Sequence, residues 1–136
     1  MTQHRSDSRS RKLATIPGIG PITAGAIAAT ISHASIFRCG RQFAAWLGLT
    51  SRANSSGGRE RQAGITKQGD GYIRRLLVVG ATAVIRALRK NSHPSGWLAR
   101  LLEQKRPKVA AVALANKMAR IAWAVMAREQ NFRATA

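Results

Sequence analysis

Hydroxyls, glycines and cations are concentrated between Asn54 and Arg75. The run contains Ser55-Ser56-Gly57-Gly58, followed by the basic residues Arg59, Arg61, Lys67, Arg74 and Arg75. Phosphoryl transfer through a serine needs a hydroxyl that reaches phosphorus, and cations or amides that stabilise the charge developing on the nonbridging oxygens. The residues alone favour a simpler interpretation, a Ser/Gly loop whose cations coat DNA phosphates, because Ser-Gly is among the commonest loop dipeptides. Nothing in the sequence visibly deprotonates the serine, and Glu60 and Asp70 are candidate bases by proximity only.

A second motif, Pro17-Gly18-Ile19-Gly20-Pro21, separates two short apolar segments with helical character. Its glycines permit a tight turn, and Ile19 would anchor that turn in the core. We expect the amides of the motif and of the following helix start to hold a phosphate without reading base identity. The residues predicted to make this contact are Gly18, Ile19, Gly20 and Thr23. A plain helix–helix connector is the alternative.

Charge indicates the kind of partner. The chain has 136 residues with 23 Lys and Arg against 5 Asp and Glu, a formal net charge of +18. A polyanion is therefore expected. An anionic membrane is disfavoured because basic residues interrupt both long apolar stretches, whereas a spanning helix needs about 20 mostly apolar residues. Without a signal peptide at its start, the chain is expected in the cytoplasm, associated with the nucleoid.

Helical periodicity predicts that further basic residues lie together on one face of each of two long helices. From Tyr72 to Lys90 the apolar positions recur with helical spacing. They are Ile73, Leu76, Leu77, Gly80, Ala81, Val84 and Leu88. At 100° per residue, Arg75, Arg86 and Arg89 fall together on the other side, within about one third of the circumference. A last helix, over 107–130, brings Lys117 and Arg120 beside its apolar stripe. We expect both faces to contact DNA phosphates, although charged helix faces are often only solvated.

No window alternates apolar and polar residues as a strand would, so the predicted fold is all-α, with five or six helices. A helical domain over 12–130 would carry a helix-hairpin-helix element at 13–32 and a serine loop at 50–71. Residues 1–11 are predicted to be a disordered basic tail and 131–136 a second tail. The three tryptophans, Trp46, Trp97 and Trp123, are expected to pack in the core. A single cysteine, Cys39, and three widely spaced histidines indicate no metal site or cofactor in this chain.

Five blocks occur in a fixed order along the chain: 13–21, 43–49, 55–58, 64–70 and 72–77. Together they resemble the carboxy-terminal transposase domain of the DEDD-type bacterial insertion-sequence transposases, a family related to pilin-gene invertases and to bridge recombinases. The similarity extends from about Leu13 to Ala127. It departs from the family pattern at Ser51, where a proline is usual, and at Gln68, where an arginine is common.

The resemblance implies DNA recombination in which a serine attacks a phosphodiester and forms a covalent protein–DNA intermediate. Ser56 matches the nucleophile, with Ser55 as its rival. In that family an amino-terminal RuvC-like domain supplies four acidic residues that bind magnesium. The five acids of this chain are too few and too scattered to rebuild that site, so magnesium is implied only for the missing domain.

These features predict a DNA-binding, serine-nucleophile transposase domain, a partial transposase that is inactive without the acidic domain. Its expected partners are element ends, target DNA and full-length transposase in an oligomer, and the use of a guide RNA stays open. The alternative is a noncatalytic basic remnant or module that only binds DNA.

Overall fold

The computed structural model describes residues 8–49, 71–90 and 96–129. Within these ranges the chain forms six α-helices and one 3-10 helix, and no strand, which confirms the all-α prediction. The elements are α2 (Ser8–Leu13), α3 (Pro21–Thr30), η1 (Ala34–Ile36), α4 (Gly40–Trp46), α6 (Gly71–Arg89), α7 (Gly96–Gln104) and α8 (Pro107–Arg128). The termini, the segment 50–70 and the segment 91–95 lie outside the described residues.

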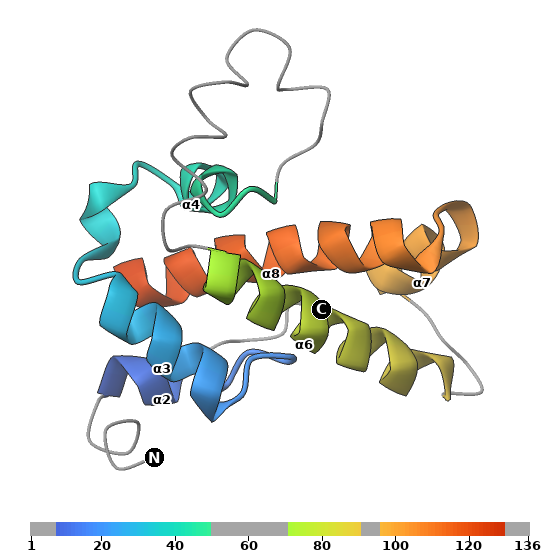
Figure 1. Cartoon of the computed structure of the whole chain (residues 1–136), viewed down its shortest axis with the longest axis horizontal. Helices are drawn as coiled ribbons and strands as arrows, with labels where there is room; N and C mark the ends of the chain where they lie inside the picture. The colour runs from blue at the N-terminus through green and yellow to red at the C-terminus, as the bar shows by residue number, and fades with distance from the viewer. Residues whose placement is uncertain (1–7, 50–70, 91–95, 130–136) are drawn as a thin grey trace, which may run out of the picture.

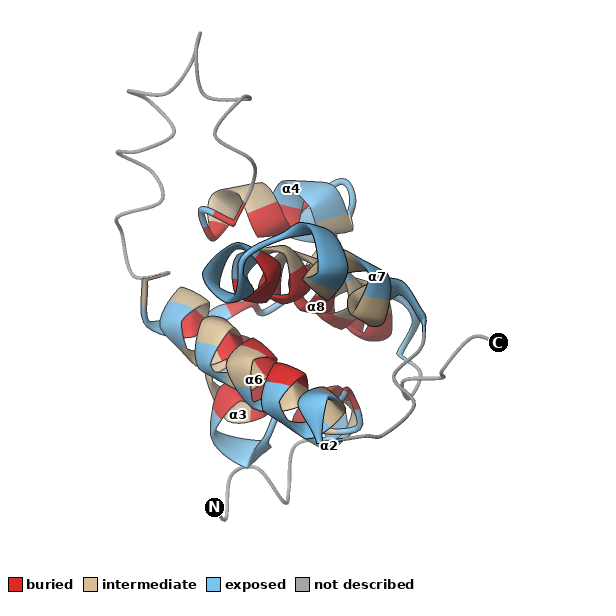
Figure 2. Ribbon diagram, turned by 90° about the vertical axis from the view of Figure 1, so that its right-hand side faces the viewer, coloured by how far each residue is buried: buried red, intermediate tan, exposed pale blue. Residues whose placement is uncertain are grey.

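Helix α8 is the centre of the bundle. It lies between α4 on one side and α6 on the other, and it also contacts α2, α7 and η1 (Figures 1 and 2). Alanines occupy much of its buried surface, including Ala110, Ala115, Ala119 and Ala122, so neighbouring helices can approach closely. The length and composition of α8 would also permit a membrane span, but half of its most apolar window is buried inside the bundle. Its central position accounts for its apolar character.

Helix α6 buries one face against this core. Ile73, Leu77, Ala81 and Ile85 are all buried, at a spacing of four residues. This face agrees with the apolar stripe predicted from the sequence, with Ile85 added to it. The opposite side of α6 is consequently left for solvent (Figure 2).

Helices α2 and α3 form a pair joined by a turn that contains the Pro-Gly-Ile-Gly-Pro motif. Leu13, Ile16 and Ile19 are buried beside Ile27 of α3. Helix α2 begins at Ser8, four residues before the expected start of the folded part at Lys12. The guanidinium of Arg9 gives the reason, because it donates hydrogen bonds to the carbonyls of Ala28, Ile31 and Ser32 near the end of α3.

An aromatic cluster holds α4 on the bundle. The rings of Phe37 and Phe43 lie 5.2 Å apart, and that of Trp46 lies 5.6 Å from Phe37. Trp46 and Trp123 are half-buried, whereas Trp97 is 37% exposed. The prediction of core packing is therefore wrong for Trp97. Trp97 is the second residue of the short helix α7, which has no buried residue and therefore does not carry the indole into the core.

Candidate nucleic-acid interface

The turn between α2 and α3 is built around Gly18. Its φ is +91°, in the left-handed region that favours glycine. The buried side chains of Ile16 and Ile19 anchor the turn in the core. The amide of Ile19 also donates a hydrogen bond of 3.0 Å to the carbonyl of Ile16. The amide of Ile19 is thus already used, and this residue serves as the predicted core anchor rather than as a phosphate contact.

The start of α3 leaves donors available. The N–H groups of Gly20, Ile22 and Thr23 have no hydrogen-bond partner among the residues that the structure describes, and Gly20 provides no side-chain cap. The positive end of the helix dipole lies at the same place. Gly20 and Ile22 are exposed, whereas Thr23 is only 7% exposed. A ligand on this surface therefore has better access to Gly20 and Ile22 than to the predicted contact Thr23.

The turn rests directly on α6. A Cβ atom on Gly80 would lie 3.1 Å from the carbonyl carbon of Gly18 and would overlap its carbonyl oxygen. From the other side, a Cβ atom on Gly18 would lie 2.8 Å from Cε of Met118 and 3.0 Å from Cγ2 of Val84. This close packing fixes the position of the start of α3 relative to α6.

Helix α6 carries the predicted arginine face. Arg75, Arg86 and Arg89 are all exposed, on the side opposite the buried stripe. None of the three makes a hydrogen bond or ion pair with another described residue. Arg89 lines a cavity of about 310 Å³ together with the acidic residue Glu103 of α7, whereas no acidic residue is found with Arg75 or Arg86 in a cavity of the described residues. Arg75 and Arg86 are the cations of this face best placed for phosphate.

The cations predicted on α8 differ from one another. Nζ of Lys117 lies 4.3 Å from the centre of the Trp97 ring, a cation–π contact that links α7 to α8. Lys117 is half-buried, whereas Arg120 is exposed and lies against Gly40 at the start of α4. The structure therefore gives Lys117 a packing role and places Arg120 away from the α6 face, on the α4 side of α8.

Ser55, Ser56, Arg59, Arg61 and Lys67 lie outside the described residues, but both ends of that segment are placed. Before it, the carbonyl of Leu49 accepts a hydrogen bond of 3.0 Å from Nδ2 of Asn116 on α8. After it, Gly71 begins α6, and a Cβ atom there would lie 3.8 Å from guanidinium nitrogens of both Arg74 and Arg75. The segment that carries the serines thus leads directly into the arginines of the first turn of α6.

Three residues that position this surface were not predicted from the sequence. Arg9 belongs to the stretch predicted as a tail, and Asn116 had no neighbour in sequence that indicated its bond to Leu49. Gly80 did give a signal, because a glycine inside a strongly periodic helix often marks a close approach. No group of three or more potential metal ligands occurs in the described part of the chain.

Comparison with known proteins identifies the family. Residues 10–96 match the Transposase IS116/IS110/IS902 family, a span that includes the turn, the serine segment and α6. The chain belongs to the IS116/IS110/IS902 transposase family. A "Probable family 20 transposase" of Pseudomonas aeruginosa is 51% identical over 130 residues, which are 95% of this chain and 38% of that protein.

Two further relatives are transposases of named insertion elements. The transposase of element IS1328 of Yersinia enterocolitica is 41% identical over 120 residues, 88% of this chain and 36% of the relative. That of IS1111A of Coxiella burnetii is 37% identical over 130 residues, 95% of this chain and 36% of the relative. This transposase-family chain therefore spans less than two fifths of the length of each of these relatives.

Proposed function

We propose that this chain is the DNA-binding part of a transposase and that it takes part in transposition of an insertion element. The observation that carries the proposal is that two groups suited to phosphate lie on elements that pack against each other. The amides at the start of α3 that have no partner among the described residues follow a turn whose Gly18 packs against Gly80 of α6, and α6 also presents Arg75 and Arg86. Both groups suit the sugar-phosphate backbone, which supplies affinity and register.

Membership in a transposase family supports the identity of the polyanion. Element ends and target DNA are the ligands we propose, and the nucleoid is where the chain would act. A guide RNA and assembly with full-length transposase extend the proposal, as the resemblance to bridge recombinases implies. For the chemistry, we propose that the chain works together with an acidic domain, as the resemblance implies.

The chemistry that we propose uses Ser56, or Ser55, as the nucleophile. The hydroxyl oxygen would form a bond to phosphorus while one phosphorus–oxygen bond to deoxyribose breaks. The serine proton is lost, and the departing sugar oxygen gains one. Arg74 and Arg75, in the first turn of α6, would stabilise the negative charge on the nonbridging oxygens. Any magnesium would be held by the acidic domain.

The experiment is a search for a covalent adduct. The chain is mixed with labelled element-end DNA, with and without a purified acidic domain from a full-length relative, and analysed on a denaturing gel. We expect an adduct only when the acidic domain is present, and we expect its loss in Ser56→Ala or in Ser55→Ala. An adduct that survives both substitutions would remove the serine mechanism.

A noncatalytic DNA-binding module is the second candidate. It requires the same α6 face and the same α3 start but no chemistry. Duplex binding of normal affinity together with no adduct under any condition would select this candidate.

A further inference from the structure

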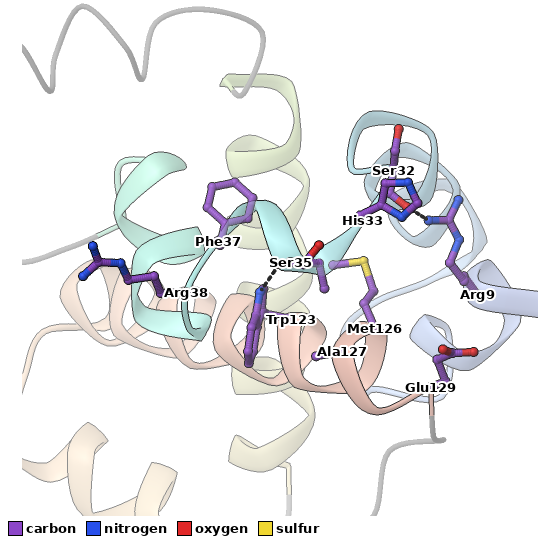
Figure 3. Close-up of a pocket in the computed structure, with 11 residues that line it drawn as sticks. Arg9, Ser32, His33, Ser35, Phe37, Arg38, Trp123, Met126, Ala127 and Glu129 are labelled. Carbon is purple, nitrogen blue, oxygen red and sulfur yellow. Dashed lines mark hydrogen bonds between the residues drawn. The ribbon is translucent and has the colours of Figure 1, made fainter.

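A groove of about 830 Å³ lies on the side of the bundle where η1 packs against the end of α8 (Figure 3). Trp123, Met126 and Ala127 of α8 contribute an aromatic and apolar floor, and Phe37 adds to it. Ser35 and Arg38 contribute polar groups from the chain around η1. This groove is separate from the α6 face and from the start of α3, because it is built from other residues.

The indole of Trp123 is held in a fixed orientation. Its Nε1 donates a hydrogen bond of 2.9 Å to the carbonyl of Ala34, the first residue of η1 (Figure 3). Trp123 is half-buried, because it packs against the core and also lines the groove. An aromatic ring held at the wall of a groove can stack on a nucleobase, and its side chain needs little further ordering on binding.

An arginine lies at each end of the groove, Arg38 at one end and Arg9 at the other (Figure 3). Arg38 is exposed, and its side chain has no hydrogen-bond partner among the described residues. At the other end of the groove, Arg9 donates hydrogen bonds to the carbonyls of Ile31 and Ser32, and Glu129 lies at the same end (Figure 3). The end at Arg38 is therefore the one that suits a phosphate, because no acidic side chain among the lining residues accompanies it.

We propose that this groove binds an unpaired nucleic-acid strand, with one base against Trp123 and the adjoining phosphate at Arg38. A duplex does not fit this arrangement, because its bases are stacked on one another and present no face to the indole. The inference rests on the proposed function in taking nucleic acid as the partner. It adds a second surface, which distinguishes unpaired from paired strands.

The test compares two arginines that are three residues apart. Arg38 lines the groove, whereas Arg41 of α4 is also exposed but does not line it. Affinities of the whole chain for a labelled 12-nucleotide DNA strand and for the matching duplex are measured by fluorescence anisotropy at one salt concentration. Arg38→Gln is expected to weaken single-strand binding about tenfold, the loss of one charged hydrogen bond, and to leave duplex binding unchanged. Arg41→Gln is the control for the loss of one charge.

Equal losses in Arg38→Gln and Arg41→Gln would overturn the proposal, as would no single-strand binding by a chain that still binds duplex. The latter result would leave the proposed function intact. Loss of binding to both forms by the unmodified chain would refute both. The same measurement with an RNA strand of the same sequence shows whether the groove prefers DNA or RNA. Binding of either strand that depends on Arg38 supports the groove.

A second readout follows the base directly. Stacking on Trp123 should quench part of the tryptophan fluorescence when an unlabelled strand is added, and Trp123→Phe should remove that part while Trp46 and Trp97 still emit. Quenching of the same amplitude in Trp123→Phe would refute base stacking at this position. Arg38 is exposed, so we expect Arg38→Gln to fold normally. The affinity test therefore remains valid even if Trp123→Phe lowers the stability of the chain.

Discussion

Replacement of Gly80 by alanine should destabilise the fold even though it removes a glycine from the middle of a helix. Alanine is favoured over glycine inside a helix by about 1 kcal/mol. Here the added Cβ would overlap the carbonyl oxygen of Gly18 and lie 3.1 Å from its carbonyl carbon. Overpacking of this kind costs about 1–3 kcal/mol. The upper end applies, because the atoms met are backbone atoms in a turn anchored by the buried Ile16 and Ile19. The net loss is about 2 kcal/mol.

The matched control is Gly25→Ala in α3, where an added Cβ meets no atom within 4 Å. That variant should gain up to about 1 kcal/mol, the helix preference alone. The assay is urea denaturation followed by circular dichroism at 222 nm. Gly80→Ala is expected to lower the midpoint by about 1 M and Gly25→Ala to raise it, for a slope of roughly 2 kcal/mol per M. Equal or higher stability of Gly80→Ala would refute the close contact between the turn and α6.

Three further predictions concern the contacts that hold the surface in place. Arg9→Met should destabilise the chain by about 1–3 kcal/mol, because the carbonyls of Ala28, Ile31 and Ser32 lose a charged donor, and thermal unfolding compared with the exposed Arg11→Met would measure it. Asn116→Ala should cost about 1 kcal/mol through the lost bond to the carbonyl of Leu49, and faster amide exchange at the end of α4 would report it; unchanged exchange would contradict that anchor. Lys117→Met should lower the free energy of unfolding by about 0.5–1 kcal/mol when Trp97 is present, and by less in a Trp97→Ala background. A double-mutant cycle measures this coupling, and a coupling energy of zero would exclude the cation–π contact.

Periodic apolar spacing predicted the long helices correctly. Helix α6 was predicted with its buried stripe and its arginine face because 19 residues supply several turns of the same pattern. The turn at 17–21 could be predicted as well, since glycine and proline restrict the backbone locally. These features depend on residues that are close in sequence.

Contacts between distant residues could not be predicted in the same way. Arg9 lies 22 residues from Ile31, and Asn116 lies 67 residues from Leu49, so no local pattern relates them. The burial of Thr23 and the exposure of Trp97 are set by which neighbouring helix covers each position. The groove beside Trp123 has the same origin, because it forms only where η1 meets the end of α8. The assignment of the nucleophile to Ser56 or Ser55 stays a prediction.

The salt dependence of duplex binding tests most directly whether the α6 face holds the sugar-phosphate backbone. The logarithm of the binding constant for element-end duplex is plotted against the logarithm of salt concentration, for the unmodified chain, for Arg75→Gln with Arg86→Gln, and for the charge-matched pair Arg41→Gln with Arg100→Gln. Each phosphate contact contributes about 0.9 to the slope, so the α6 pair should flatten it by about 2 and the control pair by much less. Slopes that fall equally in the two pairs, or that do not change in the α6 pair, would contradict the account.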